Sequence, residues 1–192
     1  MKRTYATKKI RIYKSLIANY WGLRNDTANV SALACVRELK ALTLNYDDSL
    51  YSDCLLNEGI ALRYLHKGNE AIAQFKDCLS LFKNRYGATS DFYISCLNQI
   101  ALTVSNTEEA MKYLTEAKEL IKATSNVSSE NIHGVFFNLA RCYMAISKWQ
   151  PALDELEIAE QEEKQMFGKA NLSTLQLKDQ CIFNLKQGNQ SY

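Results

Sequence analysis

The two histidines are the side chains of this sequence best suited to general acid–base catalysis or to zinc binding. A zinc site or a Cys–His nucleophile pair would require His66 and His133 to converge with thiols or carboxylates. They lie far apart in the sequence, and no spacing in the chain indicates such a group. We therefore expect two exposed histidines near helix ends, and neither a metal ion nor another cofactor.

Carboxylates are concentrated in one segment, which holds six acids and no base between Asp154 and Glu163. A catalytic acid–base pair needs two carboxylates that converge on one bond. Here the acids alternate with apolar residues in a helical pattern, which predicts a solvated helix face. The chain also contains no glycine-rich phosphate loop and no G-x-S-x-G motif. These observations favour a protein that is not an enzyme.

The six cysteines form no C-x-x-C pair, and each lies among apolar residues in a helical pattern. The sequence shows no apolar signal peptide and no run of ~18 apolar residues to cross a membrane. We therefore expect reduced thiols that act as small core residues in a reducing compartment, the cytoplasm. They are Cys35, Cys54, Cys78, Cys96, Cys142 and Cys181.

The first 25 residues carry seven bases and no acid, although the net charge of the chain is only +2. Such a segment is either a solvated helix face or a docking surface for an acidic partner. A mitochondrial presequence has a similar composition. Ile10, Tyr13 and Ile17 nevertheless follow helical spacing into the first repeat, which favours a part of the fold. The candidate basic docking surface is Lys8, Lys9, Arg11 and Lys14.

The elements that position these side chains are predicted to be helices, because the chain has one proline and seven glycines. A large apolar residue followed by a small one recurs about every 40 residues. The copies are Ile17-Ala18, Ile60-Ala61, Ile100-Ala101, Leu139-Ala140 and the degraded Cys181-Ile182. A near-constant period of this length predicts a stacked array of repeats.

A second pattern follows each of the first four copies. It consists of a small residue, a large apolar residue four positions on, and an apolar or small residue three further on, which marks one face of a helix. The copies are Ala32, Val36 and Leu39; Ala71, Phe75 and Cys78; Ala110, Leu114 and Ala117; Ala152, Leu156 and Ala159. Each repeat is therefore predicted to be a pair of helices, with alanine where the two helices cross closely.

Local signals mark where these helices begin and end. Pro151 falls in the first turn of a second helix, where its missing N–H costs little. Gly87 and Gly168 follow second helices, as glycines at helix C-termini do. Ser90 and Ser128 precede first helices and are expected to cap them.

The combined pattern resembles the tetratricopeptide repeat (TPR). Leu139-Ala140 with Tyr143 in one helix and Ala152, Leu156 and Ala159 in the next match that family position by position. The longer period and the ends Tyr86-Gly87 and Phe167-Gly168 resemble the ~42-residue variety of kinesin light chains. The resemblance implies an all-α fold, a right-handed α-α superhelix of about four and a half helix pairs.

The pattern divides residues 1–192, predicted to be a single domain, into repeat units. The fifth unit ends after one helix, so it is either a terminal cap or the start of a further repeat in a longer array. The predicted units are 5–46, 49–87, 90–125, 128–168 and the terminal helix 172–187.

The resemblance implies that the first helices line a concave groove, in which neutral amides can bind the backbone of an extended peptide. Family members that clamp the carboxylate of chaperones use lysine, asparagine and arginine; here only Asn19 matches, and Ser15, Gly59 and Gln99 occupy other positions of the clamp. The predicted groove residues are Asn19, Leu62, Asn98, Gln99, Leu102, Asn138, Arg141 and Met144.

The sequence thus predicts a non-catalytic scaffold or adaptor that binds a peptide segment or helix of another protein, either alone or as a subunit of a larger complex. One alternative is a regulator whose superhelix changes when a short peptide binds. Another is nucleic-acid binding through the basic first helix, although the other first helices add few bases.

Overall fold

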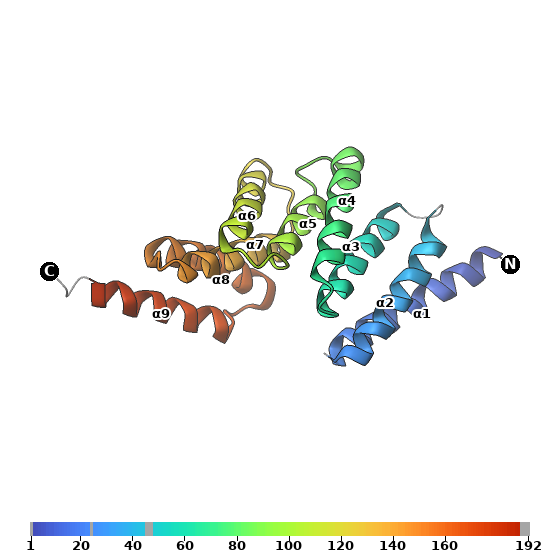
Figure 1. Ribbon diagram of the computed structural model, residues 1–192, viewed down its shortest axis with the longest axis horizontal. Helices are drawn as coiled ribbons and strands as arrows, with labels where there is room; N and C mark the ends of the chain where they lie inside the picture. The colour runs from blue at the N-terminus through green and yellow to red at the C-terminus, as the bar shows by residue number, and fades with distance from the viewer. Residues whose placement is uncertain (1, 24, 45–47, 189–192) are drawn as a thin grey trace. The chain divides into compact units, whose positions relative to one another are not determined.

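The computed structural model describes residues 2–23, 25–44 and 48–188, and every regular element in these ranges is an α-helix (Figure 1). The predicted all-α class is confirmed. The chain divides into two compact units, Met1–Arg85 and Tyr86–Tyr192. Whether they form one domain stays a prediction.

In its described residues, the first unit contains four helices. They are α1 (Lys2–Leu23), α2 (Asp26–Thr43), α3 (Asp48–Tyr64) and α4 (Gly68–Tyr86). Helix α2 packs against both α1 and α3. A buried apolar cluster joins these three helices and consists of Ile17, Val36, Leu39, Leu50 and Cys54.

Up to residue 188, where the described part of the structure ends, the second unit contains five helices. They are α5 (Asp91–Ala101), α6 (Thr107–Lys122), α7 (Ser129–Ala145), α8 (Trp149–Phe167) and α9 (Leu172–Gly188). Each packs against the next, and α5 also packs against α7. The first helices of these two successive pairs are therefore neighbours, as a stacked repeat requires.

The second helix of each pair buries one regular stripe. The predicted small and apolar residues are buried in all four, and the stripe continues to a fourth buried position eleven residues after the first. The fourth members are Thr43, Phe82, Ile121 and Glu163. Steps of four, three and four residues keep all members on one helix face.

Small residues let the helices approach closely. Ala61, Ala101 and Ala140 of the recurrent pair are buried. A Cβ at Gly59 of α3 would lie 2.3 Å from Cε1 of Phe75 on α4, which is closer than atoms can approach. Gly59 therefore serves the packing of α3 on α4, a role that the sequence pattern did not indicate.

The helix ends follow most of the predicted signals. Ser90 and Ser128 accept hydrogen bonds from Tyr93 N and Asn131 N and so cap α5 and α7. Gly87 and Gly168 have φ of 86° and 72°, the left-handed conformation that glycine adopts without strain. Pro151 lies in the first turn of α8.

The turns within two pairs contain a left-handed residue that is not glycine. In the first of them, Gly68 is the first residue of α4. The left-handed residue of this turn is His66, with φ of 59°, and Ser147 has φ of 57° between α7 and α8. His66 is exposed, as predicted.

The cysteines lie largely in the interior, as predicted. Cys54, Cys78, Cys96 and Cys181 are buried, and Cys35 and Cys142 are half-buried. Within the described ranges, the helices are too short or too polar to span a bilayer.

Candidate partner-binding surface

Polar side chains connect the first helices of two successive pairs, α5 and α7. Asn131 Nδ2 donates to the side-chain and backbone oxygens of Asp91 at 3.0 and 3.2 Å. Ser95 Oγ donates to Asn131 Oδ1 at 2.6 Å, and Ser128 N donates to Asp91 Oδ1 at 3.0 Å. These bonds fix the register of α5 against α7.

Two turns further along, an amide pair continues this row. Asn138 Nδ2 donates to Asn98 Oδ1 at 2.9 Å. The amide of Asn98 also lies over Gly134, where an added Cβ would come within 2.9 Å of Nδ2. We call Asp91, Ser95, Asn98, Asn131 and Asn138 the polar ladder.

The polar ladder includes two of the predicted groove residues, and the others vary in exposure. Asn19, Leu102 and Arg141 are exposed, whereas Gln99, Asn138 and Met144 are half-buried. Met144 packs on the apolar cluster between α7 and α8. Whether any of them contacts a partner stays a prediction.

One of the predicted groove residues, Leu62, needs correction because its side chain is interior, and the side chain of Asn98 is also largely covered. Leu62 is only 4% exposed and Asn98 only 8% exposed. The position directly after Ala61 on α3 falls on a covered side of that helix, so Leu62 is a core residue. Asn98 could contact a ligand mainly through the N–H and C=O groups of its side-chain amide, next to Asn138.

The amides of α5 retain hydrogen-bonding capacity. A carboxamide offers two N–H donors and an oxygen with two lone pairs, and the Asn98–Asn138 bond uses one donor and one acceptor. Gln99 Oε1 is buried, and in the described part of the chain it accepts no hydrogen bond. A buried acceptor left in this state costs about 1–3 kcal/mol.

In the first unit, a cavity of about 180 Å³ opens between α1, α2 and α3. Its floor is the apolar cluster of these helices, and its polar lining residues are Lys14, Asp53 and Asn57. Lys14 and Arg11 of the predicted basic surface are exposed. The side chains of Lys8 and Lys9 lie outside the described part of the structure.

The predicted solvated face of α8 is wrong at Glu155 and Glu163, which are buried. Glu163 Oε1 accepts hydrogen bonds from Asn171 Nδ2 at 2.8 Å and Thr174 Oγ1 at 2.7 Å, and it lies 2.9 Å from His133 Nε2. Its Oε2 accepts from the backbone N–H of Asn171 at 2.8 Å. The prediction that His133 is exposed was also wrong, because its side chain is half-buried and contacts this carboxylate.

These contacts decide the charge state of Glu163. Burial alone would raise its pKa. The hydrogen bonds from Thr174, Asn171 and His133 outweigh burial and hold the pKa of Glu163 below its ordinary value. The carboxylate is therefore a charged structural link between α7, α8 and the start of α9.

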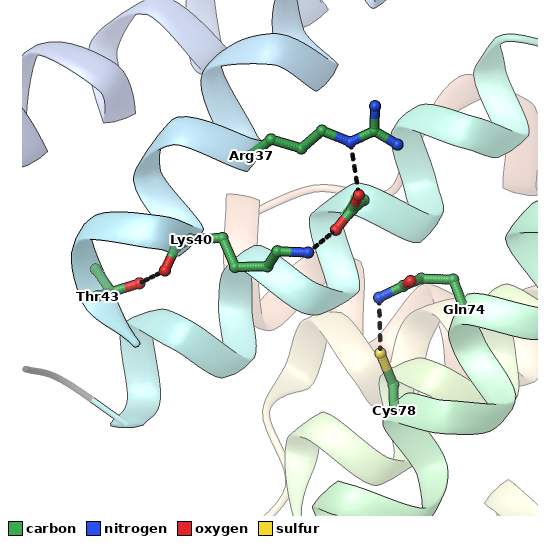
Figure 2. Close-up of polar contacts among 6 residues, drawn as sticks. Arg37, Lys40, Thr43, Gln74 and Cys78 are labelled. Carbon is green, nitrogen blue, oxygen red and sulfur yellow. Dashed lines mark hydrogen bonds and ion pairs between the residues drawn. The ribbon is translucent and has the colours of Figure 1, made fainter. Parts of the chain in front are cut away.

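Glu58 of α3 plays a similar part in the first unit. Figure 2 shows Arg37 and Lys40 reaching from α2 toward one carboxylate, that of Glu58. Arg37 Nε donates to it at 2.7 Å. Burial would raise the pKa of Glu58, but the hydrogen bonds from Lys40 and Arg37 lower it below its ordinary value.

The buried acids do not assemble into a metal centre. In the described ranges, no three His, Cys, Asp or Glu side chains are grouped so that they could hold a metal ion. Lys118 of α6 pairs with buried Glu155 of α8, which places that acid too in a contact between neighbouring helices.

Comparison with solved structures identifies the fold. The TPR-like repeats of a kinesin light chain from Podosopora anserina share 13% identity with this chain, with a TM-score of 0.64 over 95% of this chain and 89% of that one. The fold is that of the kinesin-light-chain TPR-like repeats. The structure of BtubC (BKLC) from P. vanneervenii is also similar to this chain, at 13% identity with a TM-score of 0.57 over 97% and 93% of the two chains.

The structure of a single-substitution variant of the Podosopora anserina protein is also similar to this chain, at 12% identity with a TM-score of 0.59 over 95% and 98% of the two chains. No family model and no curated protein sequence matches this chain. The TPR-like fold is therefore supported by structural likeness, and it confirms the resemblance seen in the repeat pattern.

Proposed function

We propose that this chain is a non-catalytic interaction scaffold whose first helices hold an extended peptide segment of a partner protein. The observation that carries the proposal is the Asn98–Asn138 amide pair, which spans two successive first helices and retains both donor and acceptor capacity. A peptide group has one N–H and one C=O, so it matches an amide edge of this kind.

Residues beside the polar ladder supply further contacts of two types. Leu102 is exposed at the end of α5 and would cover an apolar side chain of the peptide. Arg141 is exposed on α7, and its guanidinium would bind a carboxylate with two parallel hydrogen bonds. The amide edge would thus bind the backbone, while these two side chains select the peptide.

The fold and composition support this role. TPR-like repeats place first helices next to one another, and the contact between α5 and α7 repeats that arrangement. The buried cysteines fit a reducing compartment, so we place the scaffold in the cytoplasm, either alone or within a larger assembly.

A peptide selection tests this proposal without a known partner. Random peptides displayed on phage are panned on the purified chain, and the dissociation constants of selected peptides are measured by calorimetry. We expect Arg141→Glu and Leu102→Asp to weaken binding about tenfold or more, which corresponds to ~1.4 kcal/mol or more. Lys112→Glu, an exposed change on α6, is the matched control and leaves binding unchanged.

The variant Gly134→Ala tests the Asn98–Asn138 amide pair alone, without changing an exposed side chain of the surface. The new Cβ would meet Asn98 Nδ2 at 2.9 Å and turn that amide away from Asn138, while alanine suits the helix better than glycine. Selected peptides should therefore bind this variant more weakly although its melting temperature is unchanged or higher. Enrichment of no peptide, or equal affinity for all variants, contradicts the proposal.

A further inference from the structure

The last described helix, α9, presents an apolar face to solvent. Leu172, Leu175 and Phe183 are 70%, 40% and 61% exposed. With Asp179 they follow steps of three, four and four residues, so all four side chains share one face. Exposed apolar side chains gathered on one helix face indicate an interaction surface.

Helix α1 has exposed apolar side chains with a matching separation. Ile12 is 56% exposed and Leu23 is 62% exposed. Eleven residues separate them, as eleven separate Leu172 from Phe183, which is about 16 Å along each helix. The exposed stretch between them on α1 is polar and includes Ser15 and Asn19.

The two ends of the chain also carry opposite charge. Helix α1 contains six bases and no acid. Helix α8, which packs against α9, contains six acids and one base; Glu155 and Glu163 are buried, whereas Asp154 and Glu157 are exposed. Complementary charge of this kind steers two surfaces together and fixes their orientation.

The position of Asp179 argues against pairing of α9 with its own copy. Asp179 lies midway between Leu175 and Phe183, four residues from each. In an antiparallel pair of α9 helices centred on this stripe, the two Asp179 carboxylates would lie within about one helical turn of each other, and like charges at such a contact repel. A basic partner helix such as α1 removes this repulsion.

We propose that α1 of one copy of this chain docks on the α9 face of another copy, with its exposed bases Arg11 and Lys14 directed toward the exposed acids of α8. Leu172, Leu175 and Phe183 then pack on Ile12 and Leu23, and the polar stretch of α1 that contains Ser15 and Asn19 lies opposite Asp179. The contact uses two different surfaces, so association is head-to-tail and continues from copy to copy.

Sedimentation equilibrium of the whole chain tests this proposal. At low ionic strength, the weight-average mass should rise above the monomer value of 21.9 kDa as concentration increases. Added salt should lower the mass at fixed concentration, because it screens the charges of α1 and α8. A mass that stays at the monomer value under all these conditions overturns the proposal.

Two variants, each blocking one surface, distinguish head-to-tail contact from other modes of association. Ile12→Glu and Phe183→Glu should each sediment as a monomer, because each removes one of the two complementary surfaces. Mixed in equal amounts they should form a dimer of about twice 21.9 kDa and nothing larger, since one variant retains α9 and the other retains α1.

Val30→Glu and Ile146→Glu change exposed apolar residues elsewhere and serve as matched controls that associate like the wild type. Circular dichroism should show unchanged helix content for all four variants. Association of either single variant with itself, or failure of the mixture to form the dimer, overturns the head-to-tail contact.

Discussion

Glu163 occupies a position that two of the other three second helices fill with a large apolar residue. Phe82 and Ile121 are its equivalents in α4 and α6, and Thr43 is the equivalent in α2. The carboxylate of Glu163 binds the backbone N–H of Asn171, immediately before α9. Here the repeat exchanges apolar packing for a polar link that holds the start of the next helix.

We predict that Glu163→Gln lowers the free energy of unfolding by about 2–3 kcal/mol. The amide of glutamine would place a donor group against donors from Asn171 and Thr174, which the carboxylate accepts. Urea unfolding followed by circular dichroism measures the effect. Glu157→Gln, at an exposed position of the same helix, should change stability by less than about 0.5 kcal/mol. Equal effects of the two changes would contradict this account.

The sequence predicted local roles well but missed this contact. Ser90 and Ser128 cap helices through neighbours three residues away, so a short window contains the whole interaction. Glu163 depends on His133, 30 residues earlier, and on residues of the next loop. The available signal was its place eleven residues after Ala152, where the buried stripe of α8 continues.

At the scale of elements, Ala140 marks the crossing between α7 and its neighbours. It is fully buried, in one cluster with Ala152 and Leu156 of α8. We predict that Ala140→Leu destabilises the fold by about 1–3 kcal/mol, because the larger side chain forces these helices apart. Thermal melts should show the loss, whereas Ala145→Leu, at the exposed end of α7, should leave the melt nearly unchanged. An unchanged melting temperature for Ala140→Leu would show that Ala140 does not lie at a close helix crossing.

The contact of α3 with α4 depends on the absence of a side chain at Gly59, next to the ring of Phe75. Gly59→Ala should destabilise by about 1–3 kcal/mol, because its Cβ would overlap the ring of Phe75. Phe75→Leu in the same chain should recover part of that loss. A double-mutant cycle of urea unfolding energies therefore should give a coupling of about 1 kcal/mol or more. Additive effects would show that the two residues do not meet.

The helix pairs were predictable because their signal repeats. Alanine and a large neighbour recur at each crossing, so several copies support the same interpretation. The face of a single first-helix residue was harder to predict. Leu62 and Leu102 hold equivalent places after alanine, yet Leu62 is buried and Leu102 is exposed. That difference depends on what each helix packs against, which no local pattern contains.

At the scale of the whole molecule, acid should unfold the chain partly through Glu58 and Glu163. Their folded-state pKa values are lowered relative to ordinary carboxyls. The stabilisation is therefore fully present above the unfolded pKa, roughly 4.3, and is lost as the pH falls through the lower folded pKa. Unfolding energies measured from neutral pH to below pH 4 should decline most steeply in this acid range.

The double variant Glu58→Gln with Glu163→Gln provides the control. It should be less stable at neutral pH but should lose less stability between pH 5 and pH 3 than the wild type, because neither position then binds a proton. If the unfolding free energy of the double variant declined as steeply as that of the wild type, carboxyl groups other than Glu58 and Glu163 would cause the acid unfolding.

We propose that the first helices α5 and α7, joined by the polar ladder, form the surface that binds a partner. A crystal structure of the chain with a selected peptide tests this proposal. We expect an extended peptide across α5 and α7, with its backbone hydrogen-bonded to the amides of Asn98 and Asn138 and a side chain at Arg141. A peptide bound only to the second helices, with the polar ladder uncontacted, would contradict it.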